Sequence, residues 1–180
     1  MKSERSCPVE DLKKLIRDVP DFPKEGIIFK DITTLLKDGA QFRKSVDALA
    51  EHYNPEEIDL VLGIEARGFI FGAALAYKWA KPFIIVRKPG KLPAEIENEE
   101  YELEYGTDAI EIHRDAISKD QRVLIVDDLL ATGGTVAAVT RLVEKLGGKV
   151  SGIAFLIELG FLKGKELLSK YDVFSLLRYQ

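Results

Sequence analysis

The stretch from Arg122 to Thr135 constrains the fold more than any other part of this sequence. It opens with four apolar residues, 123–126, and then places two adjacent carboxylates, Asp127 and Asp128, where we expect a strand to end. A short apolar run that is followed by a glycine-rich break is typical of a strand covered on both faces. The sequence therefore predicts a buried strand that delivers two acids to a loop reading Leu-Leu-Ala-Thr-Gly-Gly-Thr.

A helix is expected directly after this loop, because apolar residues recur at helical spacing until a Gly-Gly pair stops the pattern. The apolar positions are Val136, Val139, Val143 and Leu146. The N-terminus of such a helix offers unpaired N–H groups and a partial positive charge, so it can hold a phosphate without a lysine. Glycines at 133 and 134 let the backbone approach the anion, and threonines at 132 and 135 can add hydroxyl donors.

The two acids would repel a phosphate but suit a diol or a water molecule on a metal, so a sugar phosphate fits the whole arrangement. Neither the Gly-x-x-x-x-Gly-Lys-Ser/Thr loop nor the dinucleotide fingerprint Gly-x-Gly-x-x-Gly opens a helix in this chain. The alternative is a plain strand–turn–helix with solvated acids. The combination of paired acids, Thr-Gly-Gly-Thr and a capped amphipathic helix favours a ligand site.

The motif Val-Asp-Asp-Leu-Leu-Ala-Thr-Gly-Gly-Thr at 126–135 resembles the phosphoribosyl-pyrophosphate loop of type I phosphoribosyltransferases, and its Asp-Leu-Leu-Ala version is similar to the adenine-specific members. The resemblance implies that Asp127 and Asp128 hold the ribose hydroxyls as catalytic residues. It also implies Mg²⁺ near these acids, held through substrate oxygens and water. The 5′-phosphate would be anchored by Ala131, Thr132, Gly133, Gly134 and Thr135.

An N-terminal segment carries a second resemblance. Leu12, Leu15, Ile16 and Val19 first predict an amphipathic helix that ends at Pro20. The motif Phe-Pro-x-x-Gly-Ile-x-Phe-Lys-Asp that follows resembles the family's adenine-binding hood, at about residues 20–35. The resemblance implies that the base stacks on Phe29 and pairs with the main chain of Ile28 and Lys30, while Leu159 closes the other face of the pocket. On the residues alone, this segment could instead be an arm that covers the core.

A strand–helix–strand unit is expected between residues 58 and 86. Ligands gather at the carboxyl ends of parallel strands, so the loop Glu65–Gly68, the turn 87–91 and the loop after Asp128 should share one edge. A lone arginine in such a loop is more often a surface residue. The resemblance, however, implies that Ala66 and Arg67 hold pyrophosphate in a loop with an unusual cis peptide.

Three cations, Arg87, Lys88 and Lys91, stand in the turn after the second strand of that unit. A charge cluster is usually solvated surface. The turn resembles the family's second pyrophosphate contact, where cations stabilise the leaving group. In relatives a cation from this turn can reach the neighbouring subunit, so we expect a homodimer.

The segment from Pro93 to Asp108 contains seven acidic and no basic residues. Apolar and polar residues alternate on both sides of Gly106, which predicts a hairpin. The hairpin could simply be exposed and kept soluble by its charge. The resemblance implies a flexible lid at about 93–113 that excludes water, with Glu104 catalytic near the base through proton exchange and Tyr105 packing on substrate.

The composition narrows the functional classes. A net charge of −4 argues against a nucleic-acid partner. The chain has no apolar run approaching the ~18 residues of a membrane span and no apolar signal segment. The lone cysteine, Cys7, cannot form an internal disulfide. We therefore expect a cytoplasmic location and no membrane contact.

The expected fold is α/β: one domain over residues 1–180, with a mostly parallel twisted sheet flanked by helices, an N-terminal hood and a hairpin lid. The expected reaction is Mg²⁺-dependent transfer of the phosphoribosyl group from phosphoribosyl pyrophosphate to adenine, giving AMP and pyrophosphate. One alternative is the same chemistry on hypoxanthine, guanine or orotate. Others are a non-catalytic regulator that senses phosphoribosyl pyrophosphate, and a response-regulator-like acid pocket, which would leave the Thr-Gly-Gly-Thr loop without a purpose.

Overall fold

The computed structural model describes residues 10–102 and 106–180. These residues belong to two compact units, Met1–Ala48 and Leu49–Gln180. Each unit is treated by itself below. Among the described residues, no helix combines the length and the apolar character that a membrane crossing requires.

The larger unit is built on a parallel five-stranded sheet in the order β4-β3-β7-β8-β9. Its strands are β3 (Leu60–Ile64), β4 (Phe83–Val86), β7 (Arg122–Leu130), β8 (Lys149–Leu159) and β9 (Val173–Tyr179). The first residues of β7, Val123–Val126, are fully buried, as are Ile153–Ile157 of β8. These near-continuous apolar runs explain why the sheet is covered on both faces.

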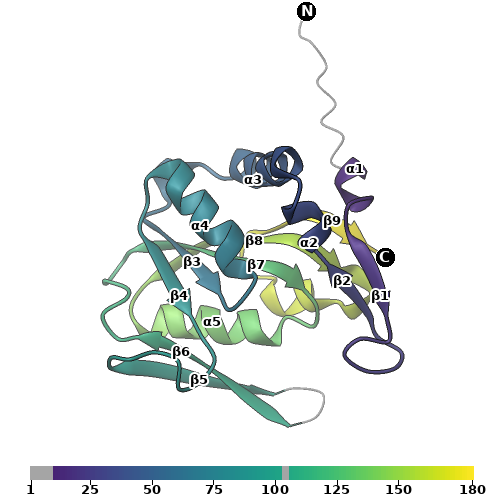
Figure 1. Ribbon diagram of the computed structural model, residues 1–180. Coiled ribbons are helices and arrows are strands. Elements are labelled where there is room, and N and C mark those ends of the chain that lie inside the picture. Colours follow the sequence, from purple (N-terminus) through teal and green to yellow (C-terminus); the bar gives the residue numbers. More distant parts are fainter. Residues whose placement is uncertain (1–9, 103–105) are drawn as a thin grey trace, which may run out of the picture. The chain divides into compact units, whose positions relative to one another are not determined.

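Two long helices cover opposite faces of this sheet (Figure 1). Helix α4 (Gly68–Trp79) connects β3 to β4, and α5 (Gly134–Lys145) connects β7 to β8. The two connections run to opposite sides of the β3–β7 pair, so this pair is the point where the strand order reverses. Ligands of open α/β sheets bind at such a point, outside the carboxyl ends of the strands.

Strand β7 is longer than the sequence indicated. We expected it to end at Asp127, but it continues to Leu130, because Leu129 and Leu130 pair with Ile157 and Glu158 of β8. The acids therefore belong to the strand, and the glycine-rich loop is shorter than expected. The helix that follows begins at Gly134, close to its expected start.

The predicted hairpin is present. Strands β5 (Ile96–Glu102) and β6 (Thr107–His113) pair antiparallel, and Gly106 has a positive φ of 92° after the turn. The described part of this unit also contains three short 3-10 helices: η1 (Pro55–Glu57), η2 (Gly160–Leu162) and η3 (Gly164–Leu168). Helix α3 (Gly39–His52) begins in one unit and ends in the other. Its last turn leads to Tyr53, whose hydroxyl donates to the carbonyl of Ile153 at 2.9 Å.

The N-terminal unit differs from the sequence prediction. Helix α1 (Glu10–Lys13) is one turn long, and the expected helix beyond it is wrong: Arg17–Pro20 form β1, which pairs antiparallel with β2 (Ile28–Asp31). The apolar spacing in this segment fits a helix, but the ladder with β2 and the Arg17–Asp31 ion pair favour the extended form. A short helix, α2 (Thr33–Leu36), follows β2.

Candidate active site at the carboxyl ends of the strands

The loop between β7 and α5 has the geometry of an anion cradle. Gly133 caps α5 with φ 86°, a left-handed conformation that favours glycine. Because α5 begins at Gly134, the N–H groups of its first residues have no acceptors within the helix. A pocket of about 80 Å³ lies here, lined by Asp127 and by Leu129–Val136. The structure thus brings together all five residues expected to hold the phosphate.

Gly164 supports this loop, and the sequence analysis missed it. A Cβ added at Gly164 would lie 2.2 Å from the carbonyl oxygen of Ala131 and 2.9 Å from the nitrogen of Gly133. A Cβ added at Gly133 would in turn lie 2.6 Å from the carbonyl oxygen of Gly164. The two backbones are therefore packed directly against each other. No local pattern marks this contact, since Gly164 lies some 30 residues downstream in a short 3-10 helix.

The two acids lie at the inner edge of the cradle. The amide of Asp128 donates to Oδ1 of Asp127 at 2.8 Å, and Nη2 of Arg67 lies 2.8 Å from Oδ2 of Asp128. A Cβ at Gly68 would lie 2.8 Å from Oδ1 of Asp127, so the start of α4 also presses on this carboxyl. Arg67, in the loop after β3, and Asp128, on β7, were both predicted as catalytic residues and are thus in contact.

The electrostatics of the pair follow from its surroundings. Burial raises the pKa of Asp127 well above its ordinary value, and the neighbouring carboxylate of Asp128 raises it further. Burial also raises the pKa of Asp128, while Arg67 opposes this effect. The ionised forms of two buried carboxyls this close together are stabilised by partners that donate hydrogen bonds or carry positive charge. Ribose hydroxyls and a hydrated cation are such partners, because both stabilise a carboxylate.

The loop after β3 confirms one specific expectation: the peptide between Glu65 and Ala66 is cis. Ala66 is exposed and Arg67 is partly buried at the start of α4. The amide of Glu65 donates to the carbonyl of Val86 at 3.0 Å, which ties this loop to the end of β4. The loop and the basic turn after β4 are therefore neighbours.

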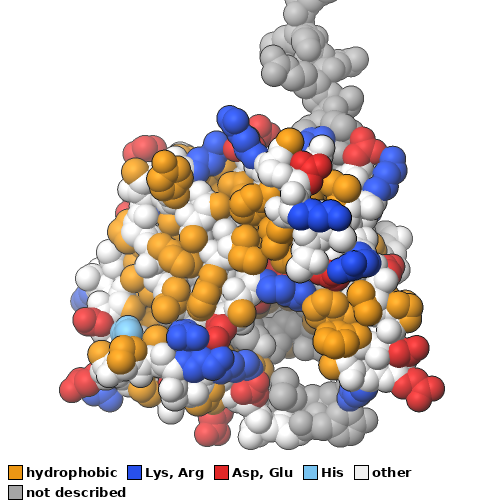
Figure 2. Space-filling view, viewed as in Figure 1, with side chains coloured by type: hydrophobic (Ala, Val, Ile, Leu, Met, Phe, Trp, Pro, Cys, Tyr) orange, Lys and Arg blue, Asp and Glu red, His pale blue; other side chains and the backbone are white. Residues whose placement is uncertain are grey.

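The cations of the basic turn have two sets of partners. Arg87 and Lys91 both contact the carboxylate of Glu65. Lys88 instead points to the hairpin, where its Nζ donates to the hydroxyl of Tyr101 at 2.8 Å and pairs with Asp108. Figure 2 shows Lys and Arg side chains gathered where β4 leads into the hairpin. The turn therefore links the loop after β3 to the hairpin.

The residues expected to bind the base are described separately, because Ile28, Phe29 and Lys30 belong to the N-terminal unit. There, Phe29 and Phe22 pack edge to face with ring centroids 5.1 Å apart, beside an open, largely apolar pocket of about 340 Å³. Lys30 Nζ donates to Asp18 at 2.6 Å, and Ile28 is 57% exposed. Leu159 ends β8 in the larger unit, where it is partly buried.

Two expected residues fall outside this account, since Glu104 and Tyr105 lie outside the described residues.

The expected metal is consistent with the donors that are described. Asp127 and Asp128 supply two carboxyls beside the cradle, and Mg²⁺ typically takes one or two carboxylates together with substrate phosphates and water. Within residues 10–102 and 106–180, no group of three or more metal-binding side chains is present.

Comparison with known proteins agrees with this geometry. Residues 33–178 match the family model described as "Phosphoribosyl transferase domain". An adenine phosphoribosyltransferase from Acidobacterium capsulatum is 60% identical over 179 residues, which cover 99% of each chain. The chain therefore belongs to the phosphoribosyltransferase family.

Solved structures narrow this further. Adenine phosphoribosyltransferase from Thermoanaerobacter pseudethanolicus is 56% identical and superposes with a TM-score of 0.93, covering 95% of this chain and 99% of its own. The Saccharomyces cerevisiae enzyme, complexed with an imino-altritol bisphosphate and adenine, is 42% identical with a TM-score of 0.89, covering 94% and 98%. These relatives, matched along almost the whole chain, are adenine phosphoribosyltransferases.

Proposed function

We propose that this protein transfers the 5-phosphoribosyl group of phosphoribosyl pyrophosphate to adenine and releases AMP and pyrophosphate, with Mg²⁺ as cofactor. The observation that carries the proposal is the anion cradle at Ala131–Thr135, with Asp127 and Asp128 directly beside it. A sugar phosphate is held at both ends by this arrangement. The adenine specificity rests on the named relatives, which match almost the whole chain at 60% and 42% identity.

The reaction asks the protein mainly for alignment and charge placement. The bond from C1′ to the pyrophosphate oxygen breaks, a bond from C1′ to a base nitrogen forms, and that nitrogen loses its proton, a transfer that the proposal assigns to Glu104. Asp127 and Asp128 hold the ribose hydroxyls and stabilise positive charge that grows on the ring. Arg67, Ala66 and the cations Arg87, Lys88 and Lys91 receive the pyrophosphate. Mg²⁺, when bound, neutralises charge on the pyrophosphate and ribose oxygens.

For the base, the proposal assigns stacking to Phe29 and edge pairing to the backbone of Ile28 and Lys30, with Leu159 as a further contact. The aromatic ring beside an apolar pocket suits a flat heterocycle. The same proposal treats residues 20–35 as hood and 93–113 as lid of one enzyme domain, with Glu104 and Tyr105 acting from the lid.

A homodimer completes the proposal. Helix α4 carries an apolar stripe at helical spacing, Phe69, Ala73 and Tyr77, and Tyr77 is 91% exposed. Figure 2 shows hydrophobic side chains gathered over α4 on this face of the molecule. Exposed apolar patches of this kind mark interaction surfaces. A second copy of the chain is the proposed partner.

The direct test is to mix purified protein with Mg²⁺, phosphoribosyl pyrophosphate and one base at a time: adenine, hypoxanthine, guanine or orotate. We expect AMP with adenine, little or no nucleotide with the others, and no product when Mg²⁺ is chelated. A nucleotide formed faster from another base would replace adenine as the substrate. Binding of phosphoribosyl pyrophosphate without any product would favour the sensing alternative.

A further inference from the structure

One carboxylate near the proposed pyrophosphate site has no role in the reaction described above. Glu65 follows the carboxyl end of β3, and its side chain is 11% exposed. It is the only acid in a loop that is proposed to bind a polyanion, Glu65–Gly68. A carboxylate repels pyrophosphate, so its presence there calls for an explanation.

The contacts of Glu65 supply one. Oε1 accepts from Nη2 of Arg87 at 3.0 Å and from Nζ of Lys91 at 2.7 Å, and Oε2 accepts from the backbone N–H of Lys88 at 2.9 Å. Three hydrogen-bond donors of the basic turn thus converge on one side chain. Nη1 of Arg87 also donates to the carbonyl of Lys91 at 3.3 Å, which closes the turn on itself.

The charge state of Glu65 agrees with this geometry. Burial alone would raise its pKa, but hydrogen bonds from Lys91, Arg87 and the Lys88 amide outweigh burial and lower the pKa to about 2. Glu65 is therefore ionised wherever the protein is folded near neutral pH. A fixed negative charge can hold two long cationic side chains in one place, which reduces the conformational entropy they lose when an anion binds.

Arg87 also retains a donor for a ligand. Its Nε is buried and has no hydrogen-bond partner among the residues that the structure describes. Nη2 is engaged with Glu65, so the guanidinium plane is fixed while Nε remains available. Buried donors are rarely left without an acceptor, and a bound anion would supply one to Nε.

We propose that Glu65 is a positioning residue: it gathers Arg87, Lys91 and the Lys88 amide into one preformed receptor for the pyrophosphate group. This inference rests on the proposed function. It goes beyond it because Glu65 contacts no substrate and acts only through the turn. The inference predicts that removal of the Glu65 charge weakens pyrophosphate binding. Charge repulsion alone would predict the opposite, because removal of a nearby carboxylate would then strengthen the binding of an anion.

The test compares Glu65→Gln with Asp59→Asn. Asp59 is a matched control at the other end of β3: it also accepts from an arginine and from a backbone N–H, both of Arg122, and its pKa is also about 2. Dissociation constants for phosphoribosyl pyrophosphate, pyrophosphate and ribose 5-phosphate, each with Mg²⁺, are measured by titration calorimetry. Ribose 5-phosphate is the internal reference because it lacks the pyrophosphate group.

We expect Glu65→Gln to weaken phosphoribosyl pyrophosphate and pyrophosphate about tenfold, as for the loss of charge-assisted hydrogen bonds, with ribose 5-phosphate within about twofold. Asp59→Asn should leave all three within about twofold. In a Lys91→Met background, Glu65→Gln should have a clearly smaller effect, because residues that act together are not additive.

Unchanged or tighter pyrophosphate binding in Glu65→Gln would overturn the proposal, and so would equal weakening of all three ligands. Should Glu65→Gln fail to fold, Glu65→Asp keeps the charge but is one methylene shorter, and the same selective loss is expected. Wild-type protein that forms no AMP would refute the proposed function instead. The two failures are therefore distinguishable.

Discussion

At the scale of single residues, the proposed phosphate cradle is packed against a glycine from another segment, Gly164. Gly164→Ala would place a Cβ 2.2 Å from the carbonyl of Ala131, so the backbone of the loop must move. We expect affinity for ribose 5-phosphate to fall about tenfold or more, and stability to fall by about 1–3 kcal/mol from overpacking. Titration calorimetry and chemical unfolding measure the two effects.

The control for Gly164→Ala is Gly39→Ala, because a Cβ at Gly39 meets no atom within 4 Å and its φ is not positive. It should leave ribose 5-phosphate affinity unchanged. If Gly164→Ala bound ribose 5-phosphate as tightly as wild type, the loop would have to tolerate the shift, and the cradle would not depend on this packing.

The hydroxyl of Thr135 gives a second prediction at this scale. Thr135 lies in the first turn of α5 and lines the cradle. We expect Thr135→Ala to weaken binding of phosphoribosyl pyrophosphate by about 1.5–3 kcal/mol, as for a lost hydrogen bond to a charged group. The matched control is Thr140→Ala in the same helix, whose hydroxyl donates to the carbonyl of Ala137 at 2.8 Å. Thr140→Ala should lower stability but not affinity, and equal affinities in both variants would contradict the assignment.

The sequence placed the residues proposed to bind substrate, but it did not indicate the residues that hold them in position. The cradle 131–135, the acids, Arg67 and the basic turn could be found because each follows a strand that the apolar pattern predicts. Gly164 and Glu65 could not, because their roles depend on contacts between segments far apart in the chain. Gly164 meets a loop about 30 residues before it, and Glu65 meets a turn more than 20 residues after it.

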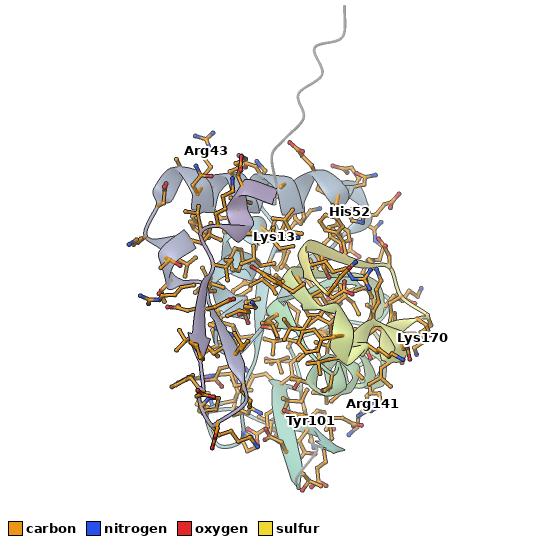
Figure 3. The ribbon with its side chains drawn as sticks, turned by 90° about the vertical axis from the view of Figure 1, so that its right-hand side faces the viewer. Lys13, Arg43, His52, Tyr101, Arg141 and Lys170 are labelled. Carbon is orange, nitrogen blue, oxygen red and sulfur yellow. The ribbon has the colours of Figure 1, made fainter. Side chains whose placement is uncertain are left out.

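At the scale of elements, the hairpin β5–β6 is attached to α5 by ion pairs. Nζ of Lys145 lies 2.7 Å from Glu97, and Arg141 pairs with Glu99 and donates to the carbonyl of Glu100. Figure 3 labels Arg141 on α5 and Tyr101 on the neighbouring hairpin. A groove of about 480 Å³ lies beside these contacts, lined in part by Tyr101 and Arg141. The hairpin is thus held by these ion pairs in addition to the apolar contact of Tyr101, Ile110 and Ile112, which are buried in the core.

The ion pairs between the hairpin and α5 predict that amide hydrogen exchange in the hairpin depends on salt concentration. The double variant Arg141→Ala/Lys145→Ala should speed amide hydrogen exchange in β5 and β6 by up to about tenfold, because exposed ion pairs contribute ~0–1 kcal/mol each. Wild type in high salt should approach the variant, since salt screens these pairs. Exchange in β7 and β8 serves as the reference and should not change. Uniform acceleration across the sheet would indicate global destabilisation and contradict the prediction.

Prediction of the elements was most accurate where the periodicity was unambiguous. The strand–helix–strand unit expected at residues 58–86 spans Leu60–Val86, α5 begins two residues before Val136, and the hairpin around Gly106 is present. The N-terminal helix was wrong beyond Lys13, because Arg17–Pro20 pair with β2 although the apolar spacing of this segment fits a helix. The end of β7 was misplaced for a related reason: pairing with a neighbour, not local sequence, extends the strand to Leu130.

At the scale of the whole molecule, the ion pair between Asp59 and Arg122 makes the free energy of unfolding depend on pH in the acid range. Two hydrogen bonds from the Arg122 side chain and one from its backbone lower the pKa of Asp59 to about 2 from 3.8. A depressed pKa gives stability that is fully present above the unfolded-state pKa and is lost as pH falls through the folded-state pKa. The wild-type free energy of unfolding should therefore exceed that of Asp59→Asn at pH 6, and the difference should shrink between about pH 4 and 2. A difference that stayed constant with pH would show that Asp59 is not ionised in this pair.

The assembly gives the last prediction. An apolar stripe on α4 that leaves Tyr77 91% exposed is costly in water for an isolated chain, and a second copy would bury it. Tyr77→Glu places a charge in that interface, so we expect the molar mass measured by light scattering to fall from dimer to monomer at micromolar concentration. Leu167→Glu is the matched control, because Leu167 is also exposed, at 62%, but lies on η3 rather than on α4. That variant should remain dimeric.

If the basic turn of one copy completes the site of the other, Tyr77→Glu should also lose AMP formation in proportion to its loss of dimer, with activity recovered as protein concentration rises. A wild-type monomer with full activity would contradict the prediction, and the exposed stripe would then need another partner.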